Sequence, residues 1–423
     1  MKNTNITPEK QGDTVNNKEN ARERGMVVFL CSLMVFITLG FCSSSNSMYV
    51  VPITEALGFS RSAYAAMYSL RYVFTAVLNL FFGGLVLRFG TKKLILVGFA
   101  FLILSTLVYS IADELALFGL GSILLGMGLS FTTTTMVGVV INSCCRENKG
   151  KYMGFVLATN GVGAAVARTI LTPIINSGDE FGFRNSYRLV VLILLAAALL
   201  ILFLLRDNGK GEKAKPKTEK SDVRTATSIT GKPYFYIVLV CAFFTGLILQ
   251  SVGGIAEPNM RDRGVDIDWI TVVFSISSII LSCTKFTTGF LYDKCGLRFT
   301  SNICYCAAAI TMPLLLLVRN STIGMILSFA YVIVYAIALP LETVMLPLFA
   351  RGLFDDASFS KALGILSAVN VAGYAIGGPI ANLFFDLTGN YDAWLVISAI
   401  AMVAICIGMN IAITLSGREL KKA

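Results

Sequence analysis

Long apolar runs separated by short polar breaks dominate this chain. Each run has about 18 residues or more, the length that an α-helix needs to cross a lipid bilayer. The cores of soluble proteins do not require such runs, so the pattern predicts an all-α polytopic membrane protein with twelve transmembrane helices in two six-helix bundles. The spans are predicted near residues 25–50, 62–87, 93–110, 115–142, 150–175 and 187–206, and again near 234–256, 268–293, 299–319, 322–350, 359–385 and 390–415.

The polar segments divide the chain into its expected units. Residues 1–24 are rich in Asn, Lys and Glu and predict a disordered cytoplasmic tail. Residues 207–233 carry a cluster of lysines and almost no apolar side chain, which predicts a basic cytoplasmic linker. The linker separates an N-terminal bundle, 25–206, from a C-terminal bundle, 234–416, and residues 417–423 form a second cytoplasmic tail.

The basic residues are distributed by side of the membrane. With both termini in the cytoplasm, 26 of the 35 Lys and Arg residues lie in cytoplasmic segments, and six lie in external loops. This positive-inside bias predicts a multi-pass protein of the cytoplasmic membrane. It also explains the net charge of +10 without nucleic acid, because the basic residues are spread along one membrane face.

Several catalytic classes lack their residues. The chain has no histidine, and most of its ten cysteines lie inside apolar runs, so neither a metal site nor a disulfide framework is expected. It has no phosphate-binding Gly-x-x-x-x-Gly-Lys-Ser/Thr loop, which argues against ATP-driven transport. We therefore expect no enzyme activity, no cofactor and no bound metal. The expected partners are the lipid bilayer and a small solute, for a protein that functions as a monomer.

Two internal repeats relate the halves of the chain. The segments 83–92 and 289–298 follow the second and eighth runs, and both have glycine at the first and eighth positions and a cation at the sixth and tenth. In the fifth and eleventh runs, Gly154, Ala158, Asn160 and Gly163 recur as Gly364, Ala368, Asn370 and Gly373. Two matches in the same order indicate a duplicated six-helix unit and a pseudo-two-fold axis.

The six-plus-six arrangement, the basic central loop and the Gly-x-x-x-Asp-Arg-x-Gly-Arg-Lys type loop resemble the major facilitator superfamily. The resemblance implies alternating access and a gating role for Gly83, Arg88, Gly90, Gly289, Asp293, Lys294, Gly296 and Arg298. The first copy has Leu87 where an acid is usual and Thr91 where a cation is usual. The arginine usual in span four is also missing, so Asp293 is the better candidate for a charged gate.

Within the superfamily, the chain looks most like the branch of oxalate/formate antiporters and monocarboxylate porters. Lys285 stands four residues before Gly289 and eight before Asp293, where that branch carries a cation. The family residue is usually Arg, and oxalate/formate antiporters also have a Lys in span eleven. Residues 363–385 hold no cation here, so one carboxylate is favoured over a dicarboxylate.

Four ionisable residues fall within the predicted spans: Arg71, Arg168, Lys285 and Glu342. A charge at this depth is costly and usually faces a protein interior or water. Lys285 and Glu342 lie at similar depth, so we predict a substrate anchor or coupling cation at Lys285. Glu342, flanked by two prolines, is either a proton-coupling group or a structural counter-ion. Arg71 is a second candidate anion contact, whereas Arg168 lies near enough to the external end to snorkel.

Uncharged polar residues in the spans have two interpretations. Asn160 and Asn370 either contact substrate or bridge helices, and the hydroxyls of Thr132 to Thr135 either face the cavity or bond to their own helix. The glycines of spans five and eleven predict close helix packing. The resulting hypothesis is a secondary carrier of a small, monocarboxylate-like organic anion, working by proton symport or anion exchange. The alternative is an efflux carrier for neutral or cationic drug-like compounds, which the Phe-rich and Met-rich walls favour.

Overall fold

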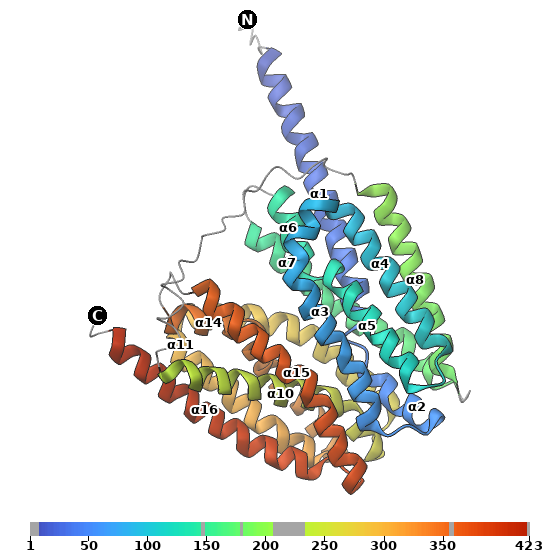
Figure 1. Cartoon of the computed structure of the whole chain (residues 1–423), viewed down its shortest axis with the longest axis vertical. Coiled ribbons are helices and arrows are strands. Elements are labelled where there is room, and N and C mark those ends of the chain that lie inside the picture. Colours follow the sequence, from blue (N-terminus) through green and yellow to red (C-terminus); the bar gives the residue numbers. More distant parts are fainter. Residues whose placement is uncertain (1–7, 145–148, 178–180, 206–232, 355–358, 421–423) are drawn as a thin grey trace, which may run out of the picture.

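A computed structural model describes residues 8–144, 149–177, 181–205, 233–354 and 359–420. Every regular element in these ranges is a helix, and the helices form two bundles joined at one end (Figure 1). Eleven stretches of the described residues are long and apolar enough to cross a membrane. The remaining expected span is α3, Arg61–Phe89, whose 29 residues extend about 44 Å at 1.5 Å per residue.

The N-terminal bundle contains eight helices that account for the first six spans. They are α1 (Pro8–Cys42), α2 (Ser47–Leu57), α3, α4 (Thr91–Ile111), α5 (Leu115–Thr132), α6 (Thr134–Cys144), α7 (Lys149–Ile175) and α8 (Gly182–Leu204). α1 begins at Pro8, so it continues back through much of the 1–24 tail, for which the sequence predicted disorder. Adding a residue to an existing helix costs far less free energy than starting a helix. The helix that forms in the apolar segment therefore continues back into the polar segment.

The C-terminal bundle follows the linker, most of which, 206–232, lies outside the described residues. Its helices are α10 (Pro233–Asp262), α11 (Ile267–Leu317), α12 (Thr322–Ala338), α13 (Pro340–Thr343), α14 (Met345–Leu353), α15 (Phe359–Thr388) and α16 (Asp392–Leu420). α11 combines spans eight and nine, which meet at Gly296 with φ +77° and ψ 175°. Gly90, the equivalent residue in the first repeat, has φ +81° and ψ 160°. The repeated glycine thus makes the same turn twice, in a conformation that favours glycine.

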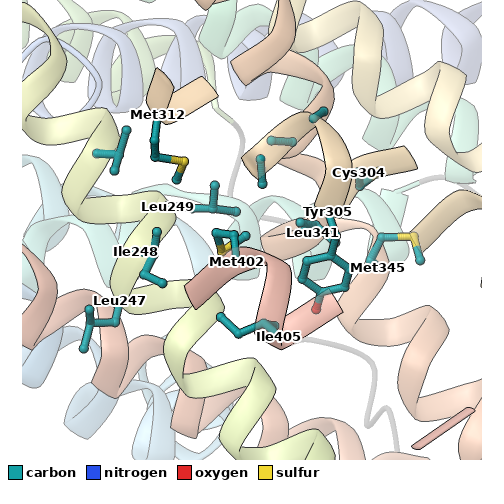
Figure 2. Close-up of a cluster of buried hydrophobic side chains, with 14 of the residues drawn as sticks. Leu247, Ile248, Leu249, Cys304, Tyr305, Met312, Leu341, Met345, Met402 and Ile405 are labelled. Atoms are coloured by element: carbon teal, nitrogen blue, oxygen red, sulfur yellow. The ribbon is translucent and has the colours of Figure 1, made fainter. Parts of the chain in front are cut away.

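Each bundle has its own apolar core. One cluster of buried side chains runs from Val28 to Leu205, and the other runs from Tyr234 to Ala412, without a shared member. Figure 2 shows part of the second core, where Tyr305 of α11 lies beside Leu341, Met345 and Ile405, and Leu247, Ile248 and Leu249 of α10 belong to the same cluster. Because neither core extends into the other half, the two bundles can move as units against each other.

The halves contact each other crosswise. α3 packs on α15, and α11 packs on α7, so span two meets span eleven and its repeat, span eight, meets span five. Across the second contact, Ser275 and Ser282 donate to the carbonyls of Ala165 and Ala158 at 3.4 and 3.2 Å. A side chain at Gly161 would collide with the backbone of Ser278. The crossed pairing is the pseudo-two-fold relation that the repeats predicted.

Candidate functional site

Two helices are interrupted at equivalent positions in the two halves. Span four breaks at Thr133, an extended residue between α5 and α6. Span ten is interrupted only in its hydrogen bonding, because Leu339 and Val344, on either side of the short α13, keep right-handed helical dihedral angles. Pro340, the first residue of α13, has no N–H to donate, which weakens the helix at this point. Interrupted spans at corresponding places in two repeats are the usual position of a carrier's binding site.

The break in span ten positions Glu342, whose residue surface is only 9% exposed. Its carboxylate lies within electrostatic contact of Lys285 from α11 and of Tyr374 from α15. Lys285 and Glu342 form no direct ion pair, and Glu342 Oε1 accepts no hydrogen bond from a described residue. The two predicted residues are therefore close, as their similar depth suggested, but they do not neutralise each other through direct contact.

Arg71 is a buried cation of the N-terminal half, with 6% of its surface exposed. Its Nη1 donates to Ser43 Oγ at 3.0 Å, and its Nη2 donates to the Tyr72 hydroxyl at 2.6 Å. The guanidinium also lies over the Tyr68 ring, 4.1 Å from its centroid. No carboxylate of a described residue pairs with Arg71, and its Nε has no hydrogen-bond partner there.

Aromatic and amide side chains connect the two charged positions. The Tyr72 hydroxyl accepts a hydrogen bond from Gln250 Nε2 of α10 at 2.6 Å. The Tyr72 ring packs edge-on against the Tyr374 ring, with centroids 5.7 Å apart. Tyr374 in turn faces Glu342, so a polar chain runs from Arg71 in one half to Lys285 in the other.

Sequence reasoning missed Tyr72, Gln250 and Tyr374, although it found the charges at both ends of this chain. Gln250 is an amide inside the apolar run of span seven and could have been singled out for that reason. Tyr374 follows Asn370 by four residues and therefore shares its helix face. Tyr72 carries no sequence signal beyond its position next to Arg71.

The two repeated asparagines differ in their surroundings. Asn370 is buried, and its Nδ2 donates to the carbonyl of Ala242 at 2.9 Å, so it connects α15 with α10. Asn160 is half-buried and accepts a hydrogen bond from Ser44 Oγ at 3.1 Å. The hydroxyls of Thr132 and Thr133 donate to carbonyls of their own helix, at Gly128 and Leu129. Asn160 is not alone in having accessible surface near the middle of its span, because Thr133 is half-buried and Thr134 and Thr135 are exposed.

At one end of the molecule, charged groups join the halves. Arg61, at the start of α3, forms a two-pronged ion pair with Asp262 at the end of α10, and its Nη2 lies 2.7 Å from Oδ1. Its Nη1 also donates to the Tyr391 hydroxyl at 3.1 Å. Asp386 of α15 accepts from the backbone N–H groups of Arg61 and Ser62, at 3.1 and 2.9 Å. We call this end the closed end; the sequence predicts that it faces outside.

Arg168 contributes a second ion pair between the halves at the closed end. Its guanidinium bonds to Glu257 of α10, and the side chains of both residues are only 5% exposed. Ser47 Oγ accepts from Arg168 at 2.9 Å and donates to Glu257 at 2.6 Å. Arg168 therefore does not snorkel to the surface, because a buried acid neutralises it. Glu257 escaped notice because it falls one residue beyond the predicted span 234–256.

The opposite end carries the repeated loops, and its contacts differ. Asp293, Lys294 and Arg298 are exposed, and Asp293 forms no ion pair with any described residue. Lys294 lies over the Phe290 ring, Arg298 contacts Thr414, and the exposed Arg88 lies over Phe89. Gly83 lies within α3, and Gly289 within α11.

The halves diverge toward this opposite end. In the described residues, no hydrogen bond between the halves lies nearer to it than the one from Ser282 to Ala158. The ends of α6 and α14 lie well apart (Figure 1). The structure thus has one end joined by ion pairs and the other end separated.

Comparison with known proteins gives a consistent result. An oxalate:formate antiporter of Oxalobacter formigenes is 22% identical over 424 residues, covering 96% of this chain and 97% of that protein. Multidrug resistance protein 2 of Bacillus subtilis is 23% identical over 237 residues, covering 54% of this chain and 58% of that protein. The crystal structure of the nucleoside transporter NupG matches 92% of this chain and 98% of its own, with a TM-score of 0.78 and 15% identity, which shows a shared fold.

The family model described as Major Facilitator Superfamily matches residues 28–352, which is more than half of the chain. Together with the two bundles, the crossed contacts and the interrupted spans, this match shows that the chain belongs to the major facilitator superfamily and is a membrane transporter with the alternating-access fold.

Proposed function

We propose that this protein moves a small, monocarboxylate-like organic anion across the cytoplasmic membrane, by proton symport or by exchange for a counter-anion. The supporting observation is the pair of cations at the junction of the halves. Arg71 and Lys285 come from opposite bundles, and neither has a direct ion-pair partner among the described residues. A buried cation without a direct counter-ion is costly, and an anionic substrate would offset that cost.

A substrate with a single carboxylate would suit the different cations of the two halves, a lysine in one and an arginine in the other. Lys285 would anchor it as a point charge from the C-terminal half, and Arg71 would contact it from the N-terminal half. Asn160 is an additional candidate contact because part of its surface is accessible, whereas Asn370 is occupied in joining α15 to α10. The antiporter relative from Oxalobacter formigenes is named for carboxylate substrates, which favours the same class here.

Glu342 is the candidate for proton coupling. A substrate carboxylate at Lys285 would compete with Glu342 for the ammonium group, and the neutral form of Glu342 would be favoured. One proton would then accompany one anion. In exchange mode, a second anion would replace the first at Lys285, and Glu342 would keep its state.

Efflux of a neutral or cationic drug-like compound is the second candidate. The aromatic groups beside Glu342, Tyr374 and Tyr335, and the relationship to a multidrug resistance protein favour it. The charges oppose it, because at the junction two cations without direct counter-ions outnumber one acid. A cationic drug would require Glu342 to act as the anchor and Lys285 to be dispensable.

Uptake into proteoliposomes separates these functions. The purified protein would be tested with a panel of carboxylates of different length, with and without a proton gradient, and after preloading with unlabelled anion. Acceleration by an inward proton gradient indicates symport, and acceleration by preloading alone indicates exchange. Transport of drug-like cations with no response to any carboxylate would contradict the proposed substrate class. Reporter fusions after Ala423 and near Asp262 would test the proposed cytoplasmic C-terminus.

A further inference from the structure

The Tyr72 hydroxyl occupies an unusual position in the polar chain between Arg71 and Lys285. It accepts hydrogen bonds from Arg71 Nη2 within its own half and from Gln250 Nε2 of the opposite half, both at 2.6 Å. An arginine can only donate, and the amide donates through the same kind of N–H group. These two bonds occupy both lone pairs of the phenol oxygen.

The hydroxyl proton of Tyr72 is therefore left to donate, and no described residue accepts it. A phenol that accepts two bonds is polarised and becomes a stronger donor. The Arg71 guanidinium lies against the same hydroxyl, and its buried Nε has no hydrogen-bond partner among the described residues. Two donors on neighbouring residues, one of them cationic, suit a carboxylate oxygen better than any neutral group.

Gln250 matters because it comes from α10, on the other side of the junction. It reaches Tyr72 in this arrangement, in which the halves are joined at the closed end. A separation of the halves that moved α3 away from α10 would remove the second hydrogen bond of the phenol. The contact between Tyr72 and Gln250 thus connects the position of the halves to the donor strength at the anion site.

We infer that Tyr72 is a substrate-contacting donor that completes the anion site at Arg71, and that Gln250 is a positioning residue that acts on the anion through the Tyr72 hydroxyl. The inference rests on the proposed function for its substrate and extends it to a residue pair. The contact also stabilises the joined arrangement in the empty carrier, because it is a hydrogen bond between the halves.

A double-mutant cycle tests the inference in transport. Tyr72→Phe should raise KM about tenfold with little change in the maximal rate, the loss expected for one hydrogen bond to a charged group. Gln250→Leu should raise KM about threefold, and the double variant should resemble Tyr72→Phe alone, because Gln250 acts through the missing hydroxyl. Tyr331→Phe is the matched control, since Tyr331 is a buried tyrosine of α12 whose hydroxyl forms no hydrogen bond with a described residue. Additive effects of the two changes, or an unchanged KM in Tyr72→Phe, would overturn the assignment.

A Gln250→Glu variant adds a test with a distinct signature. The introduced carboxylate can only accept, so it would take the Tyr72 proton that the substrate needs. KM should rise at least as much as in Tyr72→Phe. A KM equal to that of the unaltered protein would show that the phenol proton is not used.

A measurement without substrate separates this inference from the proposed function. Spin labels at Glu114 and Asn320, one in each half at the closed end, report the distance between the halves in the empty carrier. Tyr72→Phe and Gln250→Leu should each shift the population toward longer distances, and Tyr331→Phe should not. An unchanged distribution in both variants would refute the contact as a stabiliser, whether or not carboxylates are transported. Failure of every carboxylate in the uptake panel, with the distance shift present, would instead contradict the proposed substrate.

Discussion

Charged groups at the closed end are ion-paired between the halves, whereas charged groups at the middle of the junction are not. At the closed end, Arg61 and Arg168 each bond to a carboxylate of the other half. At the middle, Arg71, Lys285 and Glu342 are buried or half-buried without a direct ion pair in the described residues. Paired charges hold one arrangement of the halves together. Unpaired charges leave the centre incomplete, and a ligand or a proton can complete it.

The largest effect is expected from removing the central cation. Lys285→Ala should abolish transport while the protein remains in the membrane, because the substrate would lose the anchor proposed for it. Lys285→Arg should keep part of the activity, since the charge survives with a different geometry. Uptake normalised to the amount of protein in the membrane measures both. Full transport by the alanine variant would show that the centre does not depend on this charge.

Breaking the buried ion pair between Arg168 and Glu257 at the closed end should lower the stability of the protein more than its transport activity. Glu257→Gln leaves Arg168 buried without a counter-charge, a change that typically costs about 3–5 kcal/mol. Replacing both residues by Met should cost less than Glu257→Gln alone, because no charge remains unpaired. Thermal unfolding of the purified variants in detergent shows which of them is the more stable. If the double replacement were the less stable protein, the pair would contribute more than mutual neutralisation.

Glu342→Gln should separate two modes of transport. A proton-coupling residue is needed for net proton-driven uptake, whereas exchange need not return an empty carrier. The variant should therefore lose most net uptake and keep much of the exchange. Equal loss of both modes together with expression would identify Glu342 as a structural counter-ion to Lys285. Survival of both would place any proton coupling elsewhere.

The smallest effect concerns the backbone cap at the closed end. Asp386→Asn should weaken the joined arrangement by about 0.3–1 kcal/mol, the usual value of a carboxylate at a helix N-terminus. Asp268→Asn is the control, because Asp268 lies in the first turn of α11 within its own half. Labels at Glu114 and Asn320 should show a small shift to longer distances for the first variant. A shift of the same size in both variants would mean that the cap does not act between the halves.

The span pattern and the repeats were enough to predict the twelve-helix class and the pseudo-two-fold relation, because both depend on periodicity along the chain. The depth of Lys285 and Glu342 was likewise readable from residue counts. Partners across the junction were not. Arg168 and Glu257 are 89 residues apart, and Arg61 and Asp262 are 201 apart, so only the folded arrangement brings them together. The same reason hid Tyr72 and Gln250, whose contact depends on how α3 and α10 face each other.

The serine contacts between α7 and α11 have a consequence for how the carrier moves. Ser275 and Ser282 are seven residues apart, and so are the carbonyls of Ala165 and Ala158 that they reach. A helix presents another carbonyl with a spare lone pair at each turn, so a hydroxyl that leaves one can bond to the next. The two helices can therefore slide along each other with a low energy barrier, because none of these serine contacts requires a charged group to leave its partner during the movement. Resistance to movement of the halves is concentrated at the ion pairs of the closed end, where a few residues can set the rate of the whole transport cycle.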